Sequence, residues 1–158
     1  TTVLSIQALE RYVDEDKLVI DVGSGSGVLS IASVLLGARL VHAFDLDDIA
    51  VKSTTLNAKL NKVDKQIVAK QNNLLNNVNE QVDVIVSNIL AEIILRFVDD
   101  AFRNLKNGGI FITSGIIQAK KQDVKEGLIS AGFEILEINQ MEDWISIIAK
   151  KPKLEKKS

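Results

Sequence analysis

The sequence predicts an α/β protein built on a doubly wound, mostly parallel sheet of seven strands, with helices on both faces and an antiparallel last strand. Two observations predict this fold class. Short apolar runs rich in β-branched residues alternate with segments whose apolar residues recur every three or four positions. A glycine-rich loop joins the first apolar run to the helix-like segment after it, as in parallel sheets that bind ligands at the carboxyl ends of their strands.

The composition is that of one globular domain. The chain has 158 residues, of which 46% are hydrophobic, with 19 Lys and Arg against 21 Asp and Glu. A chain of this length buries roughly 70% of its unfolded surface, so it folds without a disulfide or a metal. It has no Cys and one His, which excludes thiolate zinc sites and cysteine nucleophiles and argues against a His-based metal site or triad. Any chemistry must therefore use backbone groups, carboxylates, amides, hydroxyls or a bound cofactor.

We assign residues 1–150 to the ligand-binding domain and residues 151–158 to a basic, solvated C-terminal tail. Five of the last nine residues are Lys, and the chain without these nine has 14 basic and 20 acidic residues. The negative net charge of the chain without its last nine residues favours a basic partner and argues against direct contact with nucleic acid. We find no apolar run long enough to cross a membrane and no leader before the first strand, so we expect a cytoplasmic protein without membrane contact.

The first half of the chain predicts three helices and three strands. Apolar residues at helical spacing predict helices over residues 3–13, Ser26–Leu36 and Asp48–Leu60. Apolar runs predict strands over Leu18–Val22, Leu40–Asp45 and Gln66–Lys70. The first of these strands is almost wholly apolar and stops at glycines, as expected of a strand buried on both faces. Gly37 follows the second helix, where a glycine commonly ends a helix.

The second half predicts two helices and four strands. The helices cover residues 89–104 and Ile117–Ser130, and the strands are Val82–Ser87, Ile110–Thr113, Phe133–Ile138 and Trp144–Ala149. The first of these helices has the clearest apolar spacing and ends before the turn Lys106–Gly109. Only residues 139–143 join the last two strands. This joint is too short for a parallel crossover, so the last strand must run antiparallel to the one before it.

The most informative segment is the loop Asp21-Val22-Gly23-Ser24-Gly25-Ser26-Gly27, which follows the first strand and opens a helix. Glycines there allow a tight turn and let a ligand lie against bare backbone at a helix N-terminus. A dinucleotide fingerprint needs its third glycine at position 28, where this chain has Val28, and no Gly-Lys-Ser/Thr of a phosphate loop follows. The spacing therefore argues against a nicotinamide dinucleotide and more firmly against a nucleoside triphosphate.

An acidic residue ends the second strand. Asp45 comes 18 residues after Gly27, the distance at which a carboxylate accepts hydrogen bonds from ribose hydroxyls. We therefore expect a nucleoside ligand, with no requirement for phosphate. Asp47 and Asp48 follow at once, and we assign Asp47 to capping the next helix.

These motifs, together with Ala43-Phe44-Asp45, resemble class I S-adenosylmethionine-dependent methyltransferases, which have a Rossmann-like fold, over nearly the whole chain. The resemblance implies that the glycine loop holds the methionine part of the cofactor, that the acid after the second strand holds the ribose, and that a polar residue after the third strand lies by the adenine. The cofactor-binding residues that it implies are Asp21, Gly23, Gly25, Gly27, Asp45 and either Asn73 or its neighbour Asn72. The loop that contains these two Asn lacks the Asp that is usual in the family.

Further motifs resemble the PrmA family, which methylates amino groups of a ribosomal protein, the eleventh of the large subunit. They are Asn88-Ile89-Leu90-Ala91 after the fourth strand, Thr113-Ser114-Gly115-Ile116 and Glu142-Asp143-Trp144. The opening Thr1-Thr2-Val3-Leu4 resembles the end of a His-x-Thr-Thr segment, which implies that Thr2 contacts the cofactor. The resemblance also implies a small substrate-recognition domain upstream, which this chain lacks.

Asn88 is the expected catalytic residue, and the resemblance places it beside the cofactor as well. An Asn at the carboxyl end of a central strand presents a side-chain carbonyl that accepts a hydrogen bond from an incoming amine and aims its lone pair. The structural alternative is that Asn88 caps the helix over residues 89–104. The Pro-Pro-aromatic sequence that follows Asn in relatives acting on planar amides is absent, which favours an aliphatic amine. In-line methyl transfer to such an amine requires no metal.

Several alternatives stay open at this stage. We interpret His42 as a packed residue of the second strand, whereas Trp144 belongs either to the core or to the mouth of the substrate site. Thr113 and Ser114 either touch the substrate or form a turn. The rival functions are a class I methyltransferase of a small molecule or another protein, an oxidoreductase that uses a dinucleotide, and a non-catalytic nucleoside-binding module.

Overall fold

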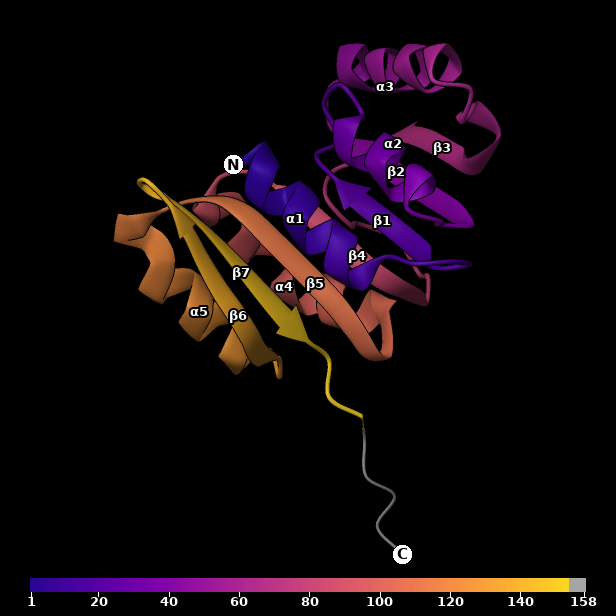
Figure 1. Ribbon diagram of the computed structural model, residues 1–158. Helices are drawn as coiled ribbons and strands as arrows, with labels where there is room; N and C mark the ends of the chain where they lie inside the picture. Colours follow the sequence, from indigo (N-terminus) through magenta and orange to yellow (C-terminus); the bar gives the residue numbers. More distant parts are fainter. Residues whose placement is uncertain (154–158) are drawn as a thin grey trace, which may run out of the picture.

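A seven-stranded sheet of order β3-β2-β1-β4-β5-β7-β6 runs through the computed structural model, which describes residues 1–153 (Figure 1). The strands are β1 (Leu18–Val22), β2 (Leu40–Asp45), β3 (Ile67–Gln71), β4 (Val82–Asn88), β5 (Leu105–Ile117), β6 (Glu134–Met141) and β7 (Trp144–Lys150). The helices are α1 (Thr2–Tyr12), α2 (Val28–Leu35), α3 (Asp48–Leu60), α4 (Ala91–Asn104) and α5 (Lys121–Ser130), with 3₁₀ turns η1 (Asp64–Gln66) and η2 (Gln118–Lys120). The predicted fold class is confirmed.

The order of the strands reverses at β1. Val19 of β1 lies opposite Val41 of β2 on one side and Val84 of β4 on the other, and both pairings are parallel. The chain builds β2 and β3 on the first side and then crosses to β4 on the second. A crevice opens at the carboxyl ends of strands where the order reverses, and doubly wound sheets bind their ligands there.

β7 is antiparallel to both of its neighbours, β5 and β6, which confirms the prediction from the short joint. The joint itself is shorter than predicted, because β6 continues to Met141 and only Glu142 and Asp143 remain as the turn. Glu142 has a φ of +56°, a left-handed conformation that tight hairpin turns use. The sequence did not reveal that β7 lies between β5 and β6.

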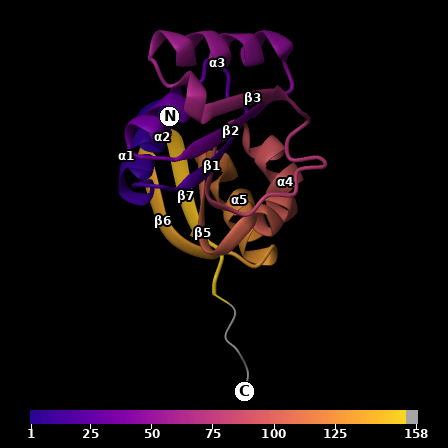
Figure 2. The same ribbon diagram turned by 90° about the vertical axis from the view of Figure 1, so that its right-hand side faces the viewer.

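Helices α1, α2 and α3 cover one face of the sheet, and α4 and α5 cover the other (Figures 1 and 2). Successive side chains of β1 point to opposite layers, as in any strand. Val19 belongs to the core that contains Leu9 and Leu29, whereas Ile20 belongs to the core that contains Ile94. Burial on both faces explains why the central strands are almost continuously apolar in sequence.

Several element boundaries differ from the predictions. The helix predicted from Ser26 begins at Val28, because Gly27 still has the left-handed φ of the loop, +88°. The strand predicted over Ile110–Thr113 is longer at both ends. At its start, Leu105 already lies opposite Val82 of β4, and at its end Ile117 pairs with Trp144 of β7, so the helix predicted from Ile117 begins only at Lys121 as α5.

Lys151 is part of the folded domain. Its Nζ donates hydrogen bonds to the carbonyls of Phe102 and Leu105, at 2.8 and 2.9 Å, and lies over the Phe102 ring. A lysine in this position satisfies free carbonyls at a helix C-terminus and complements the helix dipole, here that of α4. The prediction of a solvated tail from residue 151 is therefore wrong for Lys151, and residues 154–158 of that tail lie outside the described residues.

Within residues 1–153, no helix has both the length and the apolar character needed to span a bilayer. In the same part of the chain, His, Asp and Glu side chains form no group of three that could hold a metal ion.

Candidate functional site

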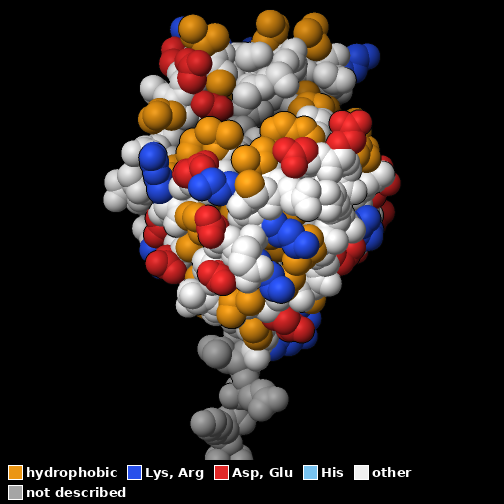
Figure 3. Space-filling view, turned by 90° about the vertical axis from the view of Figure 1, so that its left-hand side faces the viewer, with side chains coloured by type: hydrophobic (Ala, Val, Ile, Leu, Met, Phe, Trp, Pro, Cys, Tyr) orange, Lys and Arg blue, Asp and Glu red, His pale blue; other side chains and the backbone are white. Residues whose placement is uncertain are grey.

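Two adjoining cavities open at the carboxyl ends of the central strands, on the face of the molecule that Figure 3 shows. The first, which we call the Asp45 cavity, has a volume of about 250 Å³. Residues at the ends of β1 to β4 and on α4 line it, among them Gly23, Asp45, Asn72, Asn73 and Arg96. The structure therefore brings together residues that the sequence placed after four different strands.

The second cavity, the Asn88 cavity, is more open and has a volume of about 470 Å³. Its lining includes Thr1, Asn88, Leu90, Gly115 and Trp144. Ile89 and Ile93 line both cavities, so these two side chains form the wall between them. A ligand in the first cavity and a ligand in the second would thus be close neighbours.

The three glycines of the loop between β1 and α2 all have positive φ angles. A Cβ on Gly23 would lie 2.7 Å from Cγ2 of Ile89, and a Cβ on Gly27 would lie 2.9 Å from Cγ2 of Thr54. Gly25 differs, because a Cβ there would meet no protein atom within 4 Å. The first and third glycines allow close packing of the protein on itself, whereas Gly25 exposes bare backbone to the surroundings.

The amide groups of this loop are largely used within the protein. The N–H groups of Gly23 and Ser24 donate to the carbonyl of Phe44, at 2.8 and 3.0 Å, and that of Gly25 donates to Oδ2 of Asp45 at 2.9 Å. A phosphate-binding loop instead points several free N–H groups at its ligand. The geometry therefore agrees with the argument from glycine spacing against a phosphate ligand.

Helix α3 holds the glycine loop from its other side. Oγ1 of Thr54 donates to the carbonyl of Gly25 at 3.0 Å, and Nδ2 of Asn57 donates to the carbonyl of Ser26 at 2.8 Å. Thr54 is fully buried against the loop. Neither residue could be singled out from the sequence, because a Thr and an Asn three positions apart on a helix are too common to be a signal.

Asp21 is a buried carboxylate with one oxygen left unpaired. Its Oδ2 accepts a hydrogen bond of 2.7 Å from Oγ of Ser30, whereas its buried Oδ1 has no partner among the described residues. The pKa of Asp21 is raised to about 6: burial is the main cause, the Ser30 hydrogen bonds act in the opposite direction, and the charge of Asp45 adds to the effect of burial. Buried oxygens without a donor are rare, so Oδ1 is suited to a donor that a ligand or a water molecule supplies.

Asp45 is half-buried and connects the glycine loop to the start of α3. Its Oδ2 accepts from the Gly25 amide and its Oδ1 accepts from the Asp47 amide, both at 2.9 Å. Each carboxylate oxygen can accept a second hydrogen bond, so Asp45 retains acceptor capacity toward its cavity. Asp47 caps α3 as predicted, because its Oδ1 accepts from the Ile49 amide at 2.9 Å.

Asn72 and Asn73 both line the Asp45 cavity, but their side chains differ. The amide nitrogen of Asn72 donates to the carbonyls of Leu74 and Asn76, at 2.9 and 3.2 Å, so it stabilises its own turn. Asn73 is exposed. Of the two residues predicted to lie by an adenine, Asn73 has the side chain that is more available to a ligand.

Asn88 is the last residue of β4 and lies opposite Ser114 of β5. The N-cap position of α4 belongs to Leu90, so the alternative that Asn88 is a helix cap is wrong. Ser87 donates a hydrogen bond of 2.9 Å to the carbonyl of Val22, which ties the ends of β4 and β1 together. Asn88 is thereby held at the strand end next to the point where the strand order reverses.

Trp144 and Thr1 complete the Asn88 cavity. Trp144 is 37% exposed and lines the cavity, so its interpretation as a core residue is wrong, and its place at the mouth of a substrate site stays a prediction. Thr1, rather than the predicted Thr2, lines the cavity, because Thr2 is exposed in the first turn of α1.

Thr113, Ser114 and His42 bond to or pack against neighbouring residues of the sheet. The two hydroxyl residues are fully buried and bond to β7, Thr113 to the carbonyl of Ile147 and Ser114 to Oγ of Ser146. They form neither a turn nor part of the cavity lining. The His42 ring stacks beside Phe44 with its centroid 6.2 Å away, as expected of a packed strand residue.

Comparison with known sequences identifies close relatives. A model of the family described as ribosomal protein L11 methyltransferase (PrmA) matches residues 1–152. Proteins named ribosomal protein L11 methyltransferase from Oceanobacillus iheyensis and Bacillus subtilis are 66% and 63% identical over 152 and 151 residues. These alignments cover 96% of this chain but only 48% and 49% of the relatives. The chain thus spans about half the length of the curated relatives it matches.

Solved structures agree with this relationship. A structure described as ribosomal protein L11 methylase from Lactobacillus delbrueckii subsp. bulgaricus matches with a TM-score of 0.93 at 34% identity, over 96% of this chain and 79% of that chain. A tRNA m1G37 methyltransferase from M. jannaschii, with a TM-score of 0.80 at 20% identity over 95% of this chain and 49% of that one, shares the fold alone. Because the family match extends over nearly all of the sequence, the chain belongs to the ribosomal protein L11 methyltransferase (PrmA) family.

Proposed function

We propose that this chain is the catalytic domain of an S-adenosylmethionine-dependent methyltransferase that modifies amino groups of ribosomal protein L11. The observation that carries the proposal is the shared wall of Ile89 and Ile93 between the Asp45 cavity and the Asn88 cavity. This arrangement suits a nucleoside cofactor on one side and an amine on the other. The names of the relatives support the identity of the substrate.

The residues of the Asp45 cavity suit the parts of this cofactor, which supplies an electrophilic methyl group on a sulfonium sulfur when bound. Asp45 has acceptor capacity for ribose hydroxyls, and the apolar side chains of Leu46 and Leu74 in the cavity wall suit a base. The unpaired Oδ1 of Asp21 and the bare backbone of Gly25 suit the amino-acid portion. The loop amides already donate within the protein, which disfavours the rival dinucleotide.

Asn88 would orient the amine. Its side-chain carbonyl can accept one N–H of the incoming amine, which fixes the direction of the nitrogen lone pair. Holding two reacting groups in such a geometry contributes roughly 7–11 kcal/mol of a reaction barrier. Asn88 therefore acts by position and requires no proton transfer of its own.

The lining of the Asn88 cavity would help the amine to lose its proton. A lysine amine has a pKa near 10.4, so about one molecule in 2,500 is neutral at pH 7. The side chains of Leu90, Ile93 and Trp144 form apolar surroundings that disfavour the charged amine and lower its pKa. No carboxylate occurs among the described residues that line this cavity, so dehydration and positioning carry the reaction without a general base.

The charge of the domain supports a basic protein substrate. Residues 1–149 carry 14 basic and 20 acidic side chains. Such a surface attracts a basic partner and repels nucleic acid at long range. We therefore place the protein among enzymes that act on a ribosomal protein without direct contact with RNA.

The first experiment is calorimetric titration of the protein with S-adenosylhomocysteine, the demethylated product, beside an identical titration with NAD. We expect S-adenosylhomocysteine to bind and the titration with NAD to give no heat of binding. Binding of NAD in preference would contradict the cofactor assignment.

The second experiment measures transfer of a labelled methyl group to purified ribosomal protein L11, with free lysine as the competing small molecule. We expect transfer to L11, and a decrease in kcat of about 100-fold for the Asn88→Ala variant because the amine is no longer oriented. Equal transfer to free lysine would favour a small-molecule methyltransferase. Cofactor binding without any transfer would favour a non-catalytic module.

A further inference from the structure

Gly115 lies directly against the end of β4. It belongs to β5, at the irregularity between Thr113 and Ile116 where the pairing with β7 shifts its register. Its φ is +79°, and a Cβ at this position would fall 2.8 Å from Oδ1 of Asn88 and 2.9 Å from the carbonyl oxygen of Ile89. Carbon and oxygen atoms that are not bonded stay well beyond these separations, so only glycine fits here.

The Asn88 amide depends on this contact for its position. Among the described residues, the hydrogen bonds at the end of β4 hold Ser87, through the carbonyl of Val22, and leave the Asn88 side chain unbonded. Asn88 and Gly115 line the same cavity, and Oδ1 of Asn88 lies against the space that a Cβ on Gly115 would occupy. Packing against Gly115 therefore takes the place of a hydrogen bond.

We propose that Gly115 is a positioning residue, whose missing side chain sets the direction of the Asn88 carbonyl in the cavity. The inference rests on the proposed function, in which that carbonyl orients an amine. A methyl group at position 115 would displace the Asn88 oxygen, because the other close atoms belong to the backbone of Ile89 and are harder to move. A displacement of about 1 Å at a reacting group can lower a rate by about 100-fold.

The test compares Gly115→Ala with a matched control, Gly108→Ala, in the same strand. Gly108 also has a positive φ, +83°, but a Cβ there would approach only the Lys153 side chain, at 3.4 Å. Both variants carry the same kind of backbone strain, and only the first affects Asn88. We expect Gly115→Ala to lower kcat for methyl transfer to L11 by roughly 10- to 100-fold, with the affinity for S-adenosylhomocysteine within about 3-fold of the unmodified protein.

A spectroscopic readout separates positioning from a general structural effect. The side-chain amide resonances of Asn88 should shift in Gly115→Ala and stay in place in Gly108→Ala. An unchanged kcat in Gly115→Ala would overturn the proposal. A reduced kcat with unshifted Asn88 resonances would also overturn it. A loss of affinity for S-adenosylhomocysteine as large as the loss of kcat would overturn it as well.

The unmodified protein provides a test that does not depend on folding of any variant. A nuclear Overhauser effect between the Gly115 Hα protons and the Asn88 side-chain amide is expected, and its absence would overturn the contact. Failure of the unmodified protein to transfer methyl groups would instead overturn the proposed function, because the Overhauser effect reports the contact alone.

Discussion

Asp21 and Asp45 show how surroundings give two nearby carboxylates different properties. Asp21 is fully buried with one oxygen unpaired, and burial raises its pKa to about 6. Asp45 is half-buried and accepts two backbone hydrogen bonds that hold the glycine loop. The first is therefore poised to respond to the charge of a ligand, and the second supports the shape of the site.

Asp21 should make the stability of the protein fall as the pH rises. The unfolded chain releases this proton near pH 4, whereas the folded protein holds it until about pH 6, so the folded state binds more protons in between. The stabilisation is complete below about pH 4 and is lost as the pH rises through about 6. Asp21→Asn, which stays neutral, should therefore be more stable than the unmodified protein at about pH 8, by up to about 3 kcal/mol in urea unfolding.

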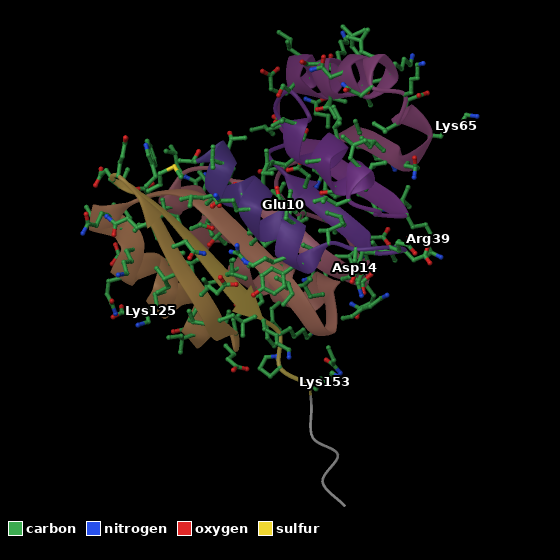
Figure 4. The ribbon with its side chains drawn as sticks, viewed as in Figure 1. Glu10, Asp14, Arg39, Lys65, Lys125 and Lys153 are labelled. Carbon is green, nitrogen blue, oxygen red and sulfur yellow. The ribbon has the colours of Figure 1, made fainter. Side chains whose placement is uncertain are left out.

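The same variant should bind S-adenosylmethionine more weakly, because a neutral amide attracts the cofactor's ammonium group less than a carboxylate does. Asp14→Asn serves as the control, since Asp14 is exposed at the far end of α1 from the cavities (Figure 4). Equal pH dependence of stability in Asp21→Asn and in the unmodified protein would contradict the raised pKa.

Asp45→Ala should weaken binding of S-adenosylhomocysteine by about 1.5–3 kcal/mol in calorimetric titration, the worth of hydrogen bonds to a charged group. The loss would combine the proposed ribose contact of Asp45 with release of the Gly25 amide. Asp47→Ala is the matched control, because Asp47 only caps α3. It should lower the free energy of unfolding by about 1 kcal/mol and leave cofactor affinity unchanged. An unaltered affinity in Asp45→Ala would remove Asp45 from the site.

At the scale of elements, α3 is the support of the glycine loop. The loop is fixed by β2 through the Phe44 carbonyl and by α3 through Thr54 and Asn57, so it is held from two sides. Gly27 allows this approach, because a Cβ there would lie 3.1 Å from the Cα of Thr54. The position of the glycine loop thus depends on the docking of a whole helix.

Thr54→Val tests this role with almost no change of shape. The variant leaves the carbonyl of Gly25, which takes part in a partly buried hydrogen bond, without the Thr54 hydroxyl, and this should lower the free energy of unfolding by about 0.5–1.5 kcal/mol. It should also weaken binding of S-adenosylhomocysteine several-fold, because the loop loses its support. Thr55→Val, whose hydroxyl bonds only to the Val51 carbonyl in the same helix, should leave cofactor affinity unchanged. Equal affinities for the two variants would show that α3 does not position the loop.

At the scale of the molecule, α1 joins the centre of the sheet to its far edge. It packs on β4, β5 and β7, and at its end the hydroxyl of Tyr12 and the guanidinium of Arg11 bind Glu137 of β6. The Tyr12 hydrogen bond is the main reason that the pKa of Glu137 lies below its ordinary value, and the Arg11 charge contributes in the same direction. This cluster lies at the opposite end of α1 from Thr1 and the cavities.

Glu137 should contribute stability with the opposite pH dependence from Asp21. Because its folded pKa is lowered, its contribution is present at neutral pH and is lost as the pH falls through that folded pKa. Glu137→Gln should lower the free energy of unfolding at pH 7 by less than about 1 kcal/mol, since the pair is partly exposed, and the difference should shrink at a pH below the folded pKa of Glu137. Urea unfolding measures both values, and Glu10→Gln on the outward face of α1 is the control (Figure 4). A constant difference across this pH range would exclude the ion pair as its cause.

The fold class and the location of the candidate site could be predicted because their signals are local. An apolar run, a glycine loop and a following helical pattern occupy adjacent positions, and parallel strands bring their carboxyl ends to one edge whatever their order. Asp45 could therefore be predicted from its place at a strand end, and Asn88 from its place at a strand end together with the resemblance of the motif that it opens. The longer extent of β5 could not be predicted, since Leu105 is in a strand only because Val82 lies beside it.

The sequence by itself determined the alternation of strands and helices, the glycine loop, and the acidic and amide residues that face the crevice. Only the tertiary structure decided that β7 lies between β5 and β6, that Thr54 supports the loop, that Trp144 borders a cavity and that Gly115 lies under Asn88. The physical reason is the same in each case. These contacts join residues that are far apart along the chain. The free energy that they contribute depends on distances that exist only after the sheet has assembled.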